Sequence, residues 1–427
     1  MAARMLCTVL GLALATPLVA AAATPAVPEA APQCRAEQGF AGGAEGRRTF
    51  LWRPDVLQDV ARRLPTDATL QPAWRALQAE ADAALQRGPY SVVDKTRLPA
   101  SGNRHDYMSL GPYWWPDPKR PGGVPYVRRD GHFNPERDGD AFDVTRLEAM
   151  SRDVQSLALA YYFSGERRYA DKAAQLLRTW FLAPATRMNP NLDHGQSIPG
   201  KVAGRAEGVI DAHRLPRVVE SIGLLAPSGT LDAQELKGLE QWFGDFAHWM
   251  VDSPIGRKEQ AARNNHGLYY DMLLTHFALF ARDTALARRT AQEAGPRRLA
   301  SQIAADGSLP HELTRTRSLH YSSWTLDAAF TLADLGQCVG VDLWQYRDGD
   351  SGRLHAAARF LAGTAVPPAR WPYPELDLDD TQDLLEVMLR AEQRWPGEGF
   401  GAAARQLAPQ HPADLLWLRS AALPATP

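Results

Sequence analysis

The densest group of chemically active side chains in the sequence lies between Arg263 and Asp271. It holds two amides, an imidazole and two phenols, supplied by Asn264, Asn265, His266, Tyr269 and Tyr270. An apolar run from Met272 to Phe280 follows directly, which predicts that the group stands at the start of a buried helix. An asparagine N-cap would explain one amide but not the adjacent His266. Because helix N-termini attract anions, we expect this stretch to serve a negatively charged ligand.

A second polar stretch, from His311 to Tyr321, supplies positive charge. Arg315 and Arg317 lie in it, and Leu319 is the only apolar residue among the last seven positions. An exposed basic helix would explain this spacing equally well. A phenol has a reference pKa of about 10, so Tyr321 can act as a base only beside positive charge or strong donors. We expect the two stretches to meet in one cleft.

Motifs for several other chemistries are absent from the sequence. It contains no glycine-rich phosphate loop, no HExxH motif and no GxSxG elbow, and its histidines lack a metal-binding spacing. We therefore expect neither a metal ion nor an organic cofactor. A glycosidase needs two carboxylates about 5 to 9 Å apart, and nothing in the sequence selects such a pair.

Length and composition indicate a soluble globular protein. A chain of 427 residues suits one large domain or two to three ordinary ones. The net charge of -2 gives no overall basic field, which argues against nucleic acid or an anionic membrane as a partner. An acidic ligand therefore needs basic residues gathered in a cleft. Twelve tryptophans and twelve tyrosines offer ring faces for sugars, although most such rings belong to a core.

The N-terminus has the pattern of an export signal. Arg4 is followed by an apolar stretch from Met5 to Val19 and by small residues up to Ala23. We predict a signal peptide at residues 1–23, a flexible lead-in at 24–45 and a single domain at 46–427. The protein is then expected in the periplasm or outside the cell, as a monomer. Cleavage leaves Cys34 and Cys338, which either pair or remain free thiols.

Helical periodicity dominates the rest of the chain, and strand patterns are scarce. Helices are predicted over residues 54–86, 146–163, 169–182, 209–224, 232–251, 267–282, 285–303, 324–335, 354–361 and 384–394. Helix pairs recur roughly every 40 to 60 residues, as in folds built by stacking such pairs. We predict an all-α fold, an incomplete α/α toroid of antiparallel helix pairs with long active-site loops, rather than a bundle.

Residues 98–140 interrupt the helical pattern with many Pro, Gly, Asp and Arg residues and several aromatic ones. A segment of this length in a compact protein is usually functional or disordered. Its aromatic residues argue against disorder. We expect an ordered loop that lines or covers a site, helped by a second loop at residues 189–208.

Several of these segments resemble the alginate lyase superfamily, which includes polysaccharide lyase family 5 and relatives that act on other polyuronates. The resemblance covers roughly residues 95 to 335. It rests on Asn265-His266, on residues 113–118 and 126–131, on Gln196 to Gly200, on Gly204-Arg205 and Ile210-Asp211, and on residues 309–321. It implies an α/α toroid, as the periodicity does.

The resemblance also implies β-elimination at a uronic acid within an acidic polysaccharide. Asn265, His266 and an arginine would neutralise the carboxylate, so that the proton on C5 can leave. We choose Arg315 over Arg317 for that arginine. Tyr321 would protonate the leaving oxygen. It would also be the base when proton and leaving group share a face of the sugar, whereas His266 would be the base otherwise.

Seven further residues are candidate substrate contacts: Tyr113, Trp115, Arg128, His194, Gln196, Tyr270 and Arg317. Two departures from relatives bear on the substrate. Tyr269 stands where relatives often have tryptophan, and Glu207 lies in a segment that is usually smaller and more apolar. A glycoside hydrolase on the same fold and a glycan-binding protein without activity are the alternatives.

Overall fold

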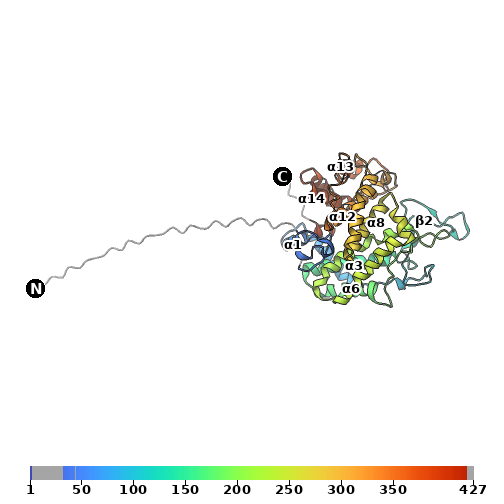
Figure 1. The fold of residues 1–427 in the computed structure, drawn as a ribbon, viewed down its shortest axis with the longest axis horizontal. Helices are drawn as coiled ribbons and strands as arrows, with labels where there is room; N and C mark the ends of the chain where they lie inside the picture. Colours follow the sequence, from blue (N-terminus) through green and yellow to red (C-terminus); the bar gives the residue numbers. More distant parts are fainter. Residues whose placement is uncertain (2–31, 44, 421–427) are drawn as a thin grey trace. The chain divides into compact units, whose positions relative to one another are not determined.

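Helices make up most of the computed structural model, which describes Met1, residues 32–43 and residues 45–420 (Figure 1). The helices are α1 (Pro54–Arg63), α2 (Gln71–Ala84), α3 (Val144–Ser164), α4 (Arg167–Leu177), α5 (Leu215–Leu225), α6 (Ala233–Asp252), α7 (Pro254–Gln260), α8 (Asn265–Phe280), α9 (Thr284–Ala294), α10 (Ala300–Gln302), α11 (Pro310–Leu313), α12 (Ser318–Cys338), α13 (Arg353–Ala365), α14 (Gln382–Arg394), α15 (Phe400–Leu407) and α16 (Leu416–Arg419). In the described ranges, no helix is long and apolar enough to cross a membrane. Apart from Met1, the predicted signal peptide lies outside them.

The helices pack in pairs that continue from one to the next. α3 contacts α2, α4 and α5, α8 contacts α6, α9 and α12, and α12 contacts α13 and α14. This arrangement is the incomplete α/α toroid that the periodicity predicts. The prediction of an all-α fold is confirmed, since strands are few and two to four residues long in the described part of the chain.

Two long helices, α8 and α12, lie side by side at the centre (Figure 1). From Asn265 to Phe280, every residue of α8 except His266 is buried. α12 is buried over most of its length as well. A helix that is apolar on all sides belongs inside a protein, which explains why this sequence places α8 and α12 within the ring.

Two predicted helix starts differ from the observed ones by more than two residues, and the stretch predicted as helical over residues 54–86 forms two helices, α1 and α2. Residues 209–224 form a tight 3₁₀ segment (Ala206–Arg214) followed by α5, not one helix. Pro216 lacks an N–H group and is favoured in the first turn of an α-helix, so the α-helical part begins there. α12 begins at Ser318, six residues before the predicted start at Trp324. The predicted start is later because the first turns of α12 are polar and do not show the apolar periodicity of a helix.

Short strands tie the two long loops together. β1 (Met108–Leu110) pairs in parallel with β4 (His194–Ser197), so residues 98–140 are fixed to residues 189–208. β2 (Trp114–Trp115) pairs with β3 (Val127–Arg128) inside the first loop. A third small sheet, β5 (Arg347–Asp348) with β6 (Ser351–Gly352), lies elsewhere in the chain. The long loop is therefore ordered, as predicted.

The N-terminal segment is attached to the ring by a disulfide and by a buried carboxylate. Cys34 is bonded to Cys338 at the end of α12. Glu220 of α5 is 1% exposed and accepts hydrogen bonds from the backbone N–H groups of Phe50, Leu51 and Trp52. Its other partner is Nε2 of His276 in α8, at 2.9 Å. The same carboxylate thus joins residues 50–52 to α5 and α8.

We predict that Glu220→Ala lowers the free energy of unfolding by about 3 to 5 kcal/mol, because it leaves several buried donors without an acceptor. Chemical denaturation of the purified protein measures this change. The control is Asp171→Ala, whose carboxylate is 56% exposed and pairs with Arg167; it should change stability by less than about 0.5 kcal/mol. Similar small effects from both substitutions would contradict the anchoring role of Glu220.

Candidate active site

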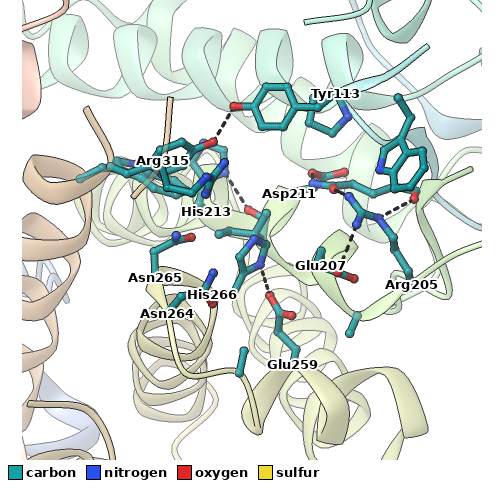
Figure 2. A pocket seen from close by; sticks show the side chains of 18 of the residues that line it. Tyr113, Arg205, Glu207, Asp211, His213, Glu259, Asn264, Asn265, His266 and Arg315 are labelled. Carbon is teal, nitrogen blue, oxygen red and sulfur yellow. Dashed lines mark hydrogen bonds and ion pairs between the residues drawn. The ribbon is translucent and has the colours of Figure 1, made fainter. Parts of the chain in front are cut away.

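A cavity of about 720 Å³ lies at the N-terminal ends of α8 and α12, below the loop of residues 98–140 (Figure 2). The two polar stretches of the sequence meet here, since Asn265, His266, Arg315 and Tyr321 all line it. Its basic lining residues are Arg128, Arg137, Arg205, Arg214, Lys258 and Arg315, against the carboxylates Glu207, Asp211 and Glu259. A chain of net charge -2 thus gathers positive charge in one cavity.

His266 is held by a buried carboxylate. Its Nδ1 lies 2.6 Å from Oε1 of Glu259, which is 2% exposed (Figure 2). Burial alone would lower the pKa of His266, but the charge and hydrogen bond of Glu259, with the charge of Glu207, raise it above its usual value. These contacts favour the protonated form of His266, and its other ring nitrogen, Nε2, is left for a ligand.

A buried arginine fixes the chain just before α8. Arg298 is 2% exposed and donates to both oxygens of Asp271, at 2.8 and 3.1 Å. It also donates to the backbone oxygens of Gln260 and Ala262. The arginine can come this close because residue 267 is glycine: a Cβ there would lie 2.1 Å from the Ala262 oxygen and 2.4 Å from Nη1 of Arg298. This contact sets the position of α7, and so of Glu259, against α8.

Asn265 is fully buried at the first position of α8. Its backbone N–H and its Nδ2 each donate to Glu312, at 2.8 Å to Oε1 and Oε2. Burial raises the pKa of Glu312, although the two Asn265 hydrogen bonds and the charges of Arg315 and His266 oppose the shift. The Oδ1 atom of Asn265 has no partner among the described residues.

Tyr321 is in contact with an arginine and a second tyrosine. Its phenol oxygen lies 2.5 Å from that of Tyr113, which the long loop brings over the cavity (Figure 2). The guanidinium carbon of Arg315 is 3.8 Å from the centre of the Tyr321 ring. Burial, and then the neighbouring Tyr321, hold the pKa of Tyr113 well above its usual range. Tyr113 therefore remains a hydrogen-bond donor at physiological pH.

Asp130 connects the long loop to Arg315. Its carboxylate accepts from Nε and Nη2 of Arg315, at 3.2 and 3.1 Å, and from the Thr316 hydroxyl at 3.1 Å. Arg128 donates to the same group at 2.5 Å. The planar guanidinium of Arg315 is thus fixed against two carboxylate oxygens, which sets its position over Tyr321.

Gln196, Arg205 and Asp211 form one network at the other side of the cavity. Gln196 has a left-handed backbone, with φ of +47°, and is 6% exposed. Its amide donates to Asp211 at 3.1 Å and accepts from Arg205 at 2.5 Å. Arg205 also pairs with Glu207 at 3.1 Å (Figure 2). The Gln196 side chain therefore forms its hydrogen bonds with other residues of the protein.

Aromatic rings form the floor of the cavity. The ring of Trp324, one helical turn beyond Tyr321, has its centre 4.0 Å from the centre of the Tyr269 ring. The ring centres of His213 and His320 lie 5.5 and 6.0 Å from that of the same indole. Burial and the charge of Arg214 hold the pKa of His213 well below its usual range, so this imidazole is neutral near pH 7. Tyr269 is buried beneath Trp324 and serves as packing.

The structure brings seven of the predicted site residues to the cavity: Asn265, His266, Arg315, Tyr321, Tyr113, Arg128 and Gln196. Four predicted contacts are not among the residues that line it. Arg317 pairs with Asp380, Trp115 donates to the His132 oxygen, Tyr270 donates to the Met250 oxygen, and His194 lies 4.0 Å from Asp106. Contact of these four with a substrate remains a prediction.

Sequence reasoning did not select Glu259, Phe133 or Trp324, and it quoted Glu312 and His320 only as parts of a motif. Trp324 could have been found, because it stands three positions after Tyr321 and so shares a helix face with it. Glu259 and His266 are seven residues apart, but they belong to two helices with a turn between them, so no helical pattern in the sequence relates them. Among the described residues, no cluster of His, Cys, Asp and Glu is placed to hold a metal ion.

Comparisons of the sequence and of the fold with known proteins point to the same family. The sequence model of a family described as alginate lyase matches residues 91–371, well over half of the chain. The fold resembles the crystal structure of an alginate lyase from Bacteroides ovatus with a TM-score of 0.83 and 38% sequence identity. That similarity covers 87% of this chain and 98% of the other.

Two curated relatives are more distant. An alginate lyase from Cobetia marina is 26% identical over 314 residues, which is 71% of this chain and 78% of that protein. An alginate lyase from Azotobacter vinelandii is 28% identical over 170 residues, or 38% of this chain. The latter match spans only 41% of the Azotobacter protein.

We predict that nuclear magnetic resonance titration of the His266 ring gives a pKa above the usual 6.5, so that the ring keeps its proton to a higher pH than a free histidine. Glu259→Gln removes the charge that raises this pKa and should lower it, because burial then acts with less opposition. An identical titration in both proteins would contradict the assigned pairing.

Proposed function

Because this chain belongs to the alginate lyase family, we propose that it is a polysaccharide lyase that cleaves alginate or a related polyuronate by β-elimination. The observation that carries the proposal is the meeting of Tyr321, Arg315, Asn265 and His266 in one basic cavity. These residues come from two helices and the segment between them, and each is held by a partner in the protein. No cofactor or metal is needed for the reaction.

The first task of such a site is to neutralise the carboxylate of the uronate at the point of cleavage. The C5 proton is weakly acidic, and its loss leaves negative charge that extends onto this carboxylate. Charged His266 and Arg315, with Asn265, surround the place where that charge develops. The two cations have fixed positions before substrate arrives, because Glu259 and Asp130 hold them.

We assign the proton transfers to Tyr321. Glu259 favours the protonated form of His266, and a protonated ring cannot accept the C5 proton, so a charge-neutralising role suits His266 better than that of base. The Tyr321 oxygen takes the C5 proton, the C4–O bond to the next sugar breaks, and a C4=C5 double bond forms. Tyr321 then gives its proton to the departing oxygen. Arg315 and the Tyr113 hydroxyl stabilise the negative charge of the Tyr321 oxygen before it takes the C5 proton and again after it has given the proton up.

A glycoside hydrolase is less well supported by the cavity. Hydrolysis needs a free acid and a second carboxylate that face the same bond. Glu259 is bound to His266, Glu207 to Arg205, and Asp211 to the hydroxyls of Tyr107 and Ser109. Each carboxylate that lines the cavity is therefore engaged with a protein partner.

We also propose that the protein acts outside the cytoplasm. The signal-like pattern of residues 1–23 supports this location. The disulfide between Cys34 and Cys338 supports it independently, since such bonds persist mainly in oxidising compartments.

Incubation of the purified enzyme with polymers of mannuronate, guluronate and glucuronate tests the reaction type. We expect at least one polymer to give the ultraviolet absorbance of a C4=C5 double bond conjugated to a carboxylate. New reducing ends without that absorbance would mean hydrolysis. Binding without any product would mean a glycan-binding protein.

Tyr321→Phe and His266→Ala should each lower kcat by about 10³-fold or more, because they remove the transferred proton and a neutralising charge. Tyr321→Phe should leave the thermal melting midpoint nearly unchanged, whereas His266→Ala should lower it, because Glu259 is then buried without its partner. Tyr169→Phe is the matched control: it removes a phenol that hydrogen-bonds Asp82 away from the cavity, and should leave kcat within about twofold. Mild effects of both cavity substitutions would show that the site is wrongly assigned.

A further inference from the structure

The two central helices share an unusual start. Asn264 precedes α8 and Arg317 precedes α12, and neither side chain caps its own helix. The first N–H groups of a helix have no partner within it, so buried helix starts need an outside acceptor. In both helices, that acceptor is a glutamate from another segment: Glu312 for α8 and Glu375 for α12.

The two glutamates differ in one respect. Glu375 accepts from the backbone N–H groups of Leu319 and His320, at 2.8 and 3.2 Å, and from those of Leu376 and Asp377. Among the described residues, it has no hydrogen bond to a side chain that lines the cavity. Glu312 accepts one backbone N–H of Asn265 with Oε1 and the side-chain Nδ2 of the same residue with Oε2. Glu375 thus caps its helix. Glu312, by contrast, makes two hydrogen bonds to Asn265, a residue that lines the cavity.

This two-point contact decides which way the Asn265 amide faces. Glu312 is 2% exposed and Asn265 is fully buried, so water cannot compete for these hydrogen bonds. A carboxylate can only accept, and it therefore draws the amide nitrogen toward itself. The amide oxygen is left on the other side, where it has no partner among the described residues.

We propose that Glu312 is a positioning residue that acts through Asn265: it accepts one N–H of the amide and thereby fixes the rotation in which the second N–H of Nδ2 remains a donor for the charged intermediate. The proposal rests on the proposed function, in which Asn265 contacts the uronate. A glutamine at position 312 keeps the size of the side chain but presents one donor and one acceptor. One of the two Asn265 donors would then face another donor, so the amide must turn over or move away.

A double-mutant cycle tests this coupling. The full mature enzyme is compared with Glu312→Gln, Asn265→Ala, the double variant and the cap control Glu375→Gln, by kcat, KM and thermal melting. The substrate is the polyuronate that the wild type cleaves fastest. Glu312→Gln should lower kcat about 10²-fold in the wild-type background, as small displacements of a catalytic group can. In the Asn265→Ala background, its effect should be less than about threefold, since it has no amide left to orient.

Glu375→Gln should lower the melting midpoint and leave kcat within about threefold. The proposal is overturned if Glu312→Gln lowers kcat by the same factor in both backgrounds, or if it matches Glu375→Gln in every readout. Should Glu312→Gln not fold, Glu312→Asp takes its place in the same cycle, because it keeps the charge but shortens the reach by one methylene.

Failure of the proposed function gives a different result. If the wild type cleaves no polyuronate, calorimetric titration of the same variants with a saturated tetrauronate measures the coupling through affinity. A loss of affinity from Glu312→Gln that disappears in the Asn265→Ala background supports the positioning role without turnover. Equal losses in both backgrounds, or no binding by the wild type, overturn it.

Discussion

The buried ion pair between Arg298 and Asp271 is the contact on which the rest of the site depends. Burying either charge alone would cost several kcal/mol, and the pair is satisfied by further hydrogen bonds to the backbone oxygens of Gln260 and Ala262. Arg298 thereby joins α8 to the turn before it. Glu259 lies just ahead of that turn, so its distance from His266 follows from this contact. Gly267 is required at the same place because Arg298 occupies the space of a side chain.

The cavity combines this fixed start of α8 with a loop that reaches over it. Asp130 and Tyr113 belong to the loop, and both contact the stretch that begins α12, through Arg315 and Tyr321. The cations that a polyanion needs are therefore not spread over the surface but held in place by single carboxylates. Such preorganised charge is worth more in a buried site than in water, because no reorganisation is needed as the intermediate forms.

Sequence reasoning identified the fold and most of the cavity, for reasons that particular residues make plain. The all-round apolar character of α8 marks it as central, and the group at Asn265 and His266 marks the end that borders the cavity. Arg315 and Arg317 could not be separated by spacing, since they lie in one polar stretch. Arg317 pairs with Asp380, more than sixty positions later, and is not among the residues that line the cavity. Glu259 and Glu312 were missed as partners because their contacts depend on how α7 and α11 fold back on α8, which no local pattern encodes.

The most direct measurement is the mass of the products formed from a susceptible polyuronate in water enriched in heavy oxygen. Elimination breaks the C4–O bond without adding water, so each new unsaturated end is lighter than a hydrolysis product by one water molecule. A site built on Tyr321 and its basic neighbours predicts unsaturated products, each lighter than the corresponding hydrolysis product by one water molecule. Saturated products that carry heavy oxygen at the new reducing end would contradict it.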